Sequence, residues 1–135
     1  YEIKEMLEGL EFRLACLRIS EVHIAQLKEN ISKMEQCIVD KDIAEYWILH
    51  EDFHGIILYS CGNSRLVDQM KQIYEYLARL RNFTLVMDKR RTKAMQEHKE
   101  IIDAFEKKDE MVAEKIGREH TVNAKKFLAK EIHLF

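Results

Sequence analysis

The sequence has no proline and only four glycines among 135 residues. Proline and glycine mark most turns, so an all-β or α/β domain of this length would normally contain more of them. Their scarcity favours long helices joined by short loops. No apolar run approaches the ~20 residues that a membrane-spanning helix needs, and no signal peptide opens the chain.

Cysteine is also sparse. Cys16, Cys37 and Cys61 are odd in number and lack a C-x-x-C spacing, which predicts reduced thiols in the cytoplasm rather than a disulfide framework. The formal net charge is only −2, so the overall balance does not suggest a nucleic-acid-binding surface. Hydrophobic residues make up 47% of the chain, enough for the core of one domain over residues 1–135.

Apolar residues recur at helical spacing in six segments, which predicts an all-α protein. The first segment carries an apolar stripe that we expect to face the core, made of Ile3, Met6, Leu10, Leu14 and Leu17. Ser20, Asp40 or Asp42, Ser64 and Asp109 are the expected N-caps of later segments. The six predicted helices cover about 1–18, 20–39, 42–60, 64–87, 88–107 and 109 onward.

Four histidines fall on the predicted apolar stripes of three of these helices: His50, His54, His98 and His120. His50 and His54 are four residues apart, so both point from one helix face. Two imidazoles at that spacing can bind one transition metal, and two more from facing helices can complete the site. A single inward histidine is more often a hydrogen-bonded core residue, but four together favour a metal centre.

Residues 50–54 also fit the H-E-x-x-H pattern of zinc proteases, in which Glu51 would be the general base and Glu75 a third ligand. Three points weigh against this alternative. Glu51 follows His50 by one position and turns away from its face. Such enzymes need a sheet edge to bind substrate. A protease site also leaves His98 and His120 unexplained.

Two further alternatives are a di-iron carboxylate bundle and a purely structural dimerisation domain with a histidine-containing core. The di-iron design needs two Glu-x-x-His pairs, and only Glu51 with His54 forms one. The structural alternative stays open at this point.

Several motifs follow one another along the chain. They are the segments 1–9 and 12–15, the Phe-His segment at 53–57, the turn segment at 60–66 that begins Ser-Cys-Gly-Asn, the Glu-His segment at 97–105, Asp109, and Glu119-His120. In this order, over some 120 residues, they resemble the FCD ligand-binding domain, which is the C-terminal effector domain of FadR-type regulators in the GntR family.

The resemblance implies an antiparallel bundle of six to seven helices with a divalent metal at its centre. Family members bind this metal through an aspartate and three histidines, which correspond here to His54, His98 and His120. The aspartate position holds His50 in this sequence. Four imidazoles favour zinc, nickel or copper over harder ions, so we expect one zinc or nickel ion per chain, bound by these four histidines.

The resemblance further implies a sensor of small carboxylic acids that is not an enzyme. Arg13, which lies on the apolar stripe of the first helix, is the expected partner of the carboxylate, with Asn63 and Arg81 as further effector-binding candidates. The regulator would be a cytoplasmic homodimer. It would contact DNA only through an N-terminal winged-helix domain, which we expect to precede a chain that starts at Tyr1 rather than at Met.

Overall fold

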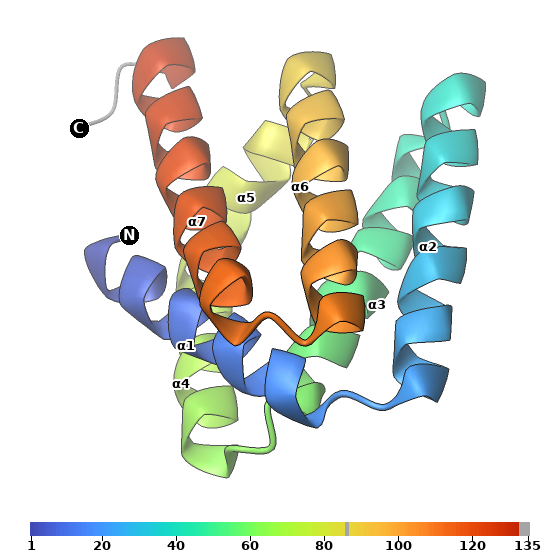
Figure 1. Cartoon of the computed structure of the whole chain (residues 1–135). Coiled ribbons are helices and arrows are strands. Elements are labelled where there is room, and N and C mark those ends of the chain that lie inside the picture. The colour runs from blue at the N-terminus through green and yellow to red at the C-terminus, as the bar shows by residue number, and fades with distance from the viewer. Residues whose placement is uncertain (86, 133–135) are drawn as a thin grey trace.

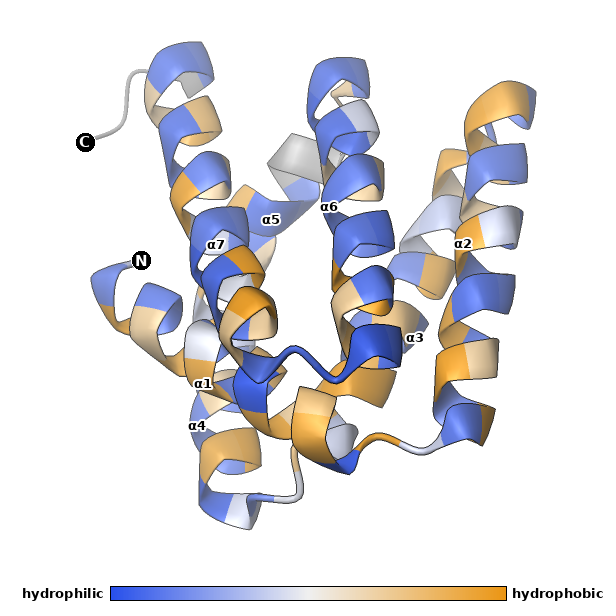
Figure 2. Cartoon of the chain, viewed as in Figure 1, coloured by the Kyte–Doolittle hydropathy of each residue, from blue (hydrophilic) through white to orange (hydrophobic). Residues whose placement is uncertain are grey.

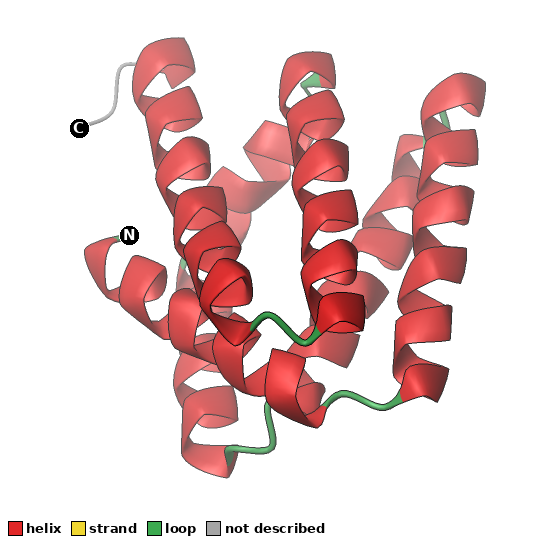
Figure 3. Cartoon of the chain, in the orientation of Figure 1, coloured by secondary structure: helices red, strands yellow, loops and turns green. Residues whose placement is uncertain are grey.

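The computed structural model describes the backbone of residues 1–85 and 87–132 and the side chains of 1–82 and 87–131. This part of the chain contains helices and loops and no strand (Figure 3). The predicted all-α bundle is therefore confirmed. Its seven helices are α1 (Glu2–Arg18), α2 (Glu21–Asp40), α3 (Ile43–Ser60), α4 (Ser64–Tyr76), α5 (Ala78–Leu85), α6 (Asp88–Lys107) and α7 (Glu110–Ile132).

Helices α2, α6 and α7 lie side by side in alternating directions, while α1 crosses below them and packs most extensively against α7 (Figure 1). Helix α3 packs against α2 and α1. Hydrophilic and hydrophobic residues both occur on every labelled helix (Figure 2). In the part of the chain that the structure describes, no helix is long and apolar enough to span a membrane.

Polar side chains cap the helices close to where the sequence predicts. Ser20, Asp42 and Asp109 each accept a hydrogen bond from a backbone N–H three residues on, at 3.1, 3.1 and 3.2 Å. The predicted Ser64 cap is wrong by one residue, because the Asn63 side chain accepts from the backbone N–H of Leu66 at 3.0 Å. Asn63 thus has a structural role at the start of α4.

The single helix predicted over 64–87 is two helices, and residue 86 lies outside the described residues. The chain leaves helical geometry at Leu77, whose φ and ψ are −96° and 5°. No glycine or proline marks this position, so the sequence carries no signal for the break. Because of the break, α5 takes its own direction and carries Arg81 towards the centre of the bundle.

The predicted inward face of α1 is wrong. Ile3, Met6, Leu10 and Leu17 are 38–70% exposed, and Leu14 is only partly buried. The face that packs against the bundle instead contains small and polar residues. Its buried members are Lys4, Glu8, Gly9, Glu11, Phe12, Ala15 and Cys16.

Two glycines explain why this face is the buried one. A β-carbon on Gly117 of α7 would lie 2.8 Å from the backbone oxygen of Glu8 and 2.9 Å from Cγ of Phe12. A β-carbon on Gly9 of α1 would lie 2.5 Å from Cγ of Arg118. The absence of both atoms lets α1 approach α7 closely, which buries the Glu8 side of α1 and leaves the apolar stripe outside.

The buried face of α1 brings two carboxyl groups into the interior, Glu8 and Glu11, both fully buried. Glu8 has a cationic partner, since its Oε2 lies 2.7 Å from Nζ of Lys4. Within the described part of the chain, Glu11 accepts only a long hydrogen bond of 3.4 Å from the Tyr74 hydroxyl. Burial, reinforced by the negative charge of Glu8, raises the pKa of Glu11 well above its ordinary value.

This environment predicts that Glu11→Gln stabilises the protein at alkaline pH. At pH values where Glu11 ionises in the unfolded chain, the native state keeps this carboxyl group protonated. The contribution of Glu11 to the free energy of unfolding is therefore fully present below pH about 4.5 and is lost as the pH rises. Glutamine carries no such cost. We expect a gain on the order of 1–3 kcal/mol at pH 8 and little difference at pH 4.5, measured by urea unfolding. Equal stability of the two proteins at pH 8 would contradict the assignment.

Candidate metal centre and adjoining cavity

The four histidines predicted from the sequence meet at the centre of the bundle. Helix α3 supplies His50 and His54, α6 supplies His98, and α7 supplies His120. The ring centroids of His50 and His54 are 4.4 Å apart, and that of His98 lies 5.5 and 5.3 Å from them. The His120 centroid lies 5.5 Å from that of His54 and 5.7 Å from that of His98.

Three of these rings lie close enough together to hold one metal ion. His50, His54 and His98 each offer one nitrogen, and the three atoms lie within 4.8 Å of one another. Both ring nitrogens of His54 and His98 and Nδ1 of His50 are buried, and none has a hydrogen-bond partner among the described groups. Buried polar atoms normally have partners, so a cation bound by one nitrogen of each ring fits this cluster better than an apolar core does.

The electrostatics keep these rings in the form that binds metal. Burial lowers the pKa of His98 to about 3, and the charge of His120 acts in the same direction. Burial and the neighbouring imidazoles also hold the pKa values of His50 and His54 well below the ordinary value. The three rings are therefore neutral near pH 7, with lone pairs available for coordination.

The side chain of His120 is oriented by Glu97, which in turn pairs with Arg90. Neither of these was named as a site residue from the sequence. Nδ1 of His120 lies 2.8 Å from Oε2 of Glu97, whose Oε1 is 2.6 Å from Nη1 of Arg90. Burial would raise the pKa of Glu97, but His120 and Arg90 lower it to about 2. An ionised carboxylate at Nδ1 leaves Nε2 of His120 for a metal, as second-shell acids do in many metal sites.

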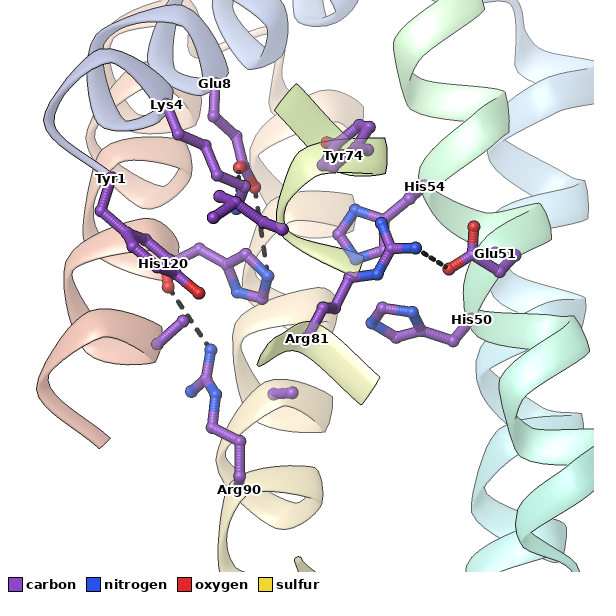
Figure 4. Close-up of a pocket in the computed structure, with 13 residues that line it drawn as sticks. Tyr1, Lys4, Glu8, His50, Glu51, His54, Tyr74, Arg81, Arg90 and His120 are labelled. Carbon is purple, nitrogen blue, oxygen red and sulfur yellow. Dashed lines mark hydrogen bonds and ion pairs between the residues drawn. The ribbon is translucent and has the colours of Figure 1, made fainter. Parts of the chain in front are cut away.

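A cavity of about 50 Å³ adjoins the histidines (Figure 4). His50, His54 and His120 line it, and Leu77 contributes apolar surface. The charged side chains that line it are Lys4, Glu8, Glu51, Arg81 and Arg90. This space holds only a few waters or a compact ligand, since one water needs about 10–15 Å³.

Two ion pairs fix the charged groups of the cavity. Arg81 Nη2 lies 2.9 Å from Oε1 of Glu51, so α5 and α3 are joined across it (Figure 4). Lys4 pairs with Glu8 as described above. Burial would raise the pKa of Glu8, but the charges of Lys4 and His120, together with hydrogen bonds from Lys4 and Thr121, lower it. Glu8 is thus an ionised acceptor inside the bundle.

The effector-binding candidates have different positions. Arg81 lines the cavity, and its role in effector binding stays a prediction. The expectation that Arg13 faces the interior is wrong: its side chain is 41% exposed and lies 3.7 Å from each of Glu110 and Glu114 on α7. Arg13 is displaced because α1 buries the opposite face. Asn63 caps α4 and does not line the cavity.

Lys4, Glu8 and Arg90 line the cavity but were missed from the sequence. Their signal was weak, because an isolated charged residue between apolar ones is usually solvated. Lys4 and Glu8 are four residues apart, the spacing of a helix ion pair, which indicates that they share a face but not that the face is buried.

The model of the FCD domain family matches residues 1–123 of the chain. The match covers most of the sequence, and the chain therefore belongs to the FCD family, the effector-binding domains of GntR-type transcriptional regulators. Among curated proteins, none matches the chain. The predicted family is confirmed, and with it the regulatory, ligand-binding class of the domain.

The histidine cluster predicts about one zinc or nickel ion per chain in protein purified without a nickel column, measured by elemental analysis. Metal that binds only the folded state stabilises it, so a chelator should lower the melting temperature by at least ~4 °C. His98→Ala should lose both the metal and the chelator response. His23→Ala, at an exposed position on α2, is the matched control. An unchanged melting curve in chelator, with no metal found, would argue for a purely structural histidine core.

Proposed function

We propose that this domain senses a small carboxylic acid through a divalent metal bound by His50, His54, His98 and His120. The observation that carries the proposal is the position of the cavity, which adjoins buried imidazole nitrogens that have no hydrogen-bond partner among the described residues. Three histidines already lie within reach of one ion. Glu97 holds His120 in the tautomer that can supply the fourth ligand.

The charges around the cavity favour an anionic effector. Three cations, Lys4, Arg81 and Arg90, are matched by three carboxylates, Glu8, Glu51 and Glu97. A divalent ion would add two positive charges to this balanced set. A carboxylate that binds at an open coordination position and near Arg81 would compensate part of that charge.

The effector signal would pass to DNA through a separate domain. Homodimerisation and an N-terminal winged-helix domain are the partners we propose for this module in the complete regulator. The net charge of −2 supports this division of labour, because strong contact with the DNA backbone needs a basic surface.

We propose that the domain has no peptidase activity in spite of its H-E-x-x-H sequence. The Glu51 carboxylate is engaged by Arg81 rather than free to activate a metal-bound water. In the part of the chain that the structure covers there is also no strand whose edge could bind an extended peptide.

Calorimetry on the zinc-loaded domain, with a panel of hydroxy-, keto- and dicarboxylic acids, tests the sensor proposal. We expect at least one acid to bind, and Arg81→Ala to lose on the order of 2–4 kcal/mol of its binding free energy, as for a buried charge-assisted contact. Arg13→Ala, which removes an arginine outside the cavity, should bind as wild type does. Equally tight binding to metal-free protein would refute a metal-linked site.

Incubation of the zinc-loaded domain with unstructured peptide substrates tests the second proposal. We expect no cleavage by wild type, and we expect Glu51→Gln to retain zinc because this side chain is not a proposed ligand. Zinc-dependent cleavage that disappears in Glu51→Gln would establish the protease alternative.

A further inference from the structure

Among the described residues, Glu8 is the carboxylate that lines the cavity and also has a buried oxygen without a hydrogen-bond partner. Its Oε2 accepts hydrogen bonds from Lys4 at 2.7 Å and from Thr121 at 3.0 Å. Its Oε1 has no hydrogen-bond partner among the described groups. Nε2 of His120 lies 4.0 Å from Oε1 (Figure 4).

An acceptor at this position does not help to bind a simple carboxylate. The proposed metal and Arg81 attract a carboxylate, whereas a second anionic oxygen nearby repels it. The unpartnered Oε1 would be satisfied only by a ligand that brings its own donor. Sites that hydrogen-bond a particular ligand group discriminate strongly against analogues without it, because the buried protein atom is then left unpaired.

We infer that the effector is a 2-hydroxycarboxylic acid, and that Glu8 Oε1 accepts the hydrogen bond from its hydroxyl group. This inference rests on the proposed function, since it assigns the second functional group of the same carboxylate. It makes Glu8 a specificity-determining residue rather than a metal ligand.

The distances require the two functional groups of the effector to be close together. Nε2 of His120, a proposed metal ligand, lies only 4.0 Å from Oε1 of Glu8. A ligand that reaches both the metal and Glu8 can therefore have few atoms between its carboxylate and its donor. The cavity of about 50 Å³ also excludes long chains. A hydroxyl on the carbon next to the carboxylate meets both conditions.

The charges favour a hydroxyl over an ammonium group as the donor. Lys4 already places an ammonium 2.7 Å from Glu8, and Arg81 and Arg90 line the same cavity. A second ammonium at Oε1 would add a cation beside these three and the proposed metal. A neutral hydroxyl donates the same hydrogen bond without that repulsion.

The test compares matched acids by calorimetry on the zinc-loaded domain: glycolate with acetate, and lactate with propionate, alanine and pyruvate. We expect the hydroxy acid of the better-fitting pair to bind at least about tenfold more tightly than its deoxy analogue. Alanine should bind more weakly than lactate. Tighter binding of alanine would overturn the hydroxyl assignment.

A hydroxyl group can also coordinate zinc directly, so a second experiment must show that Glu8 causes the preference for hydroxy acids. In Glu8→Gln we expect the ratio of hydroxy to deoxy affinity to fall about tenfold, with zinc content unchanged. Glu11→Gln is the matched control, a buried carboxyl of the same helix that does not line the cavity, and should keep the wild-type ratio. If Glu8→Gln fails to fold, Glu8→Asp, which retracts the oxygen by one methylene, replaces it.

The outcomes separate this inference from the proposed function. If hydroxy and deoxy acids bind equally, or if the preference survives in both Glu8 variants, the metal-linked carboxylate sensor stands and the role of Glu8 is wrong. If no acid of either type binds the zinc-loaded domain, the proposed function fails and this inference fails with it.

Discussion

Polar groups taken out of water must find partners, and this constraint governs the interior of the domain. In a helical bundle the backbone groups form hydrogen bonds within each helix, so it is the buried polar side chains that still need partners. The centre of this bundle contains four imidazoles, and several of their nitrogens have no partner among the described protein groups. A metal ion would satisfy one nitrogen of each ring that binds it.

Two adjacent residues of α7 connect the histidine cluster with the cavity. His120 is held by Glu97 of α6, while Thr121 donates to Glu8 of α1. The orientation of α7 therefore sets the fourth proposed metal ligand and the free oxygen of Glu8 at the same time. A ligand that changed the spacing between α1 and α7 would therefore move both His120 and Glu8. Such a movement could transmit effector binding to another part of the regulator.

Much of this architecture could be predicted from the sequence, because its signals are local. Helix caps, apolar spacing and the four histidines predicted the bundle and its centre correctly. The errors concern choices that depend on packing. The most apolar face of α1 is not its buried face, since close contact at Gly9 and Gly117 outweighs hydrophobicity there. The outward position of Arg13 follows from the same tertiary contacts, which no short sequence window contains. The break at Leu77 is marked by no glycine or proline.

The two glycines of the α1–α7 crossing also bear on how the selectivity of this domain can change. Adding one methyl group at Gly117 would place a carbon within 3 Å of the backbone of Glu8, so the helices must separate. That separation would shift Glu8 relative to Thr121 and His120, although position 117 does not line the cavity. New ligand preferences can therefore arise from substitutions that never touch a ligand, and a mutational survey confined to the cavity wall would overlook them.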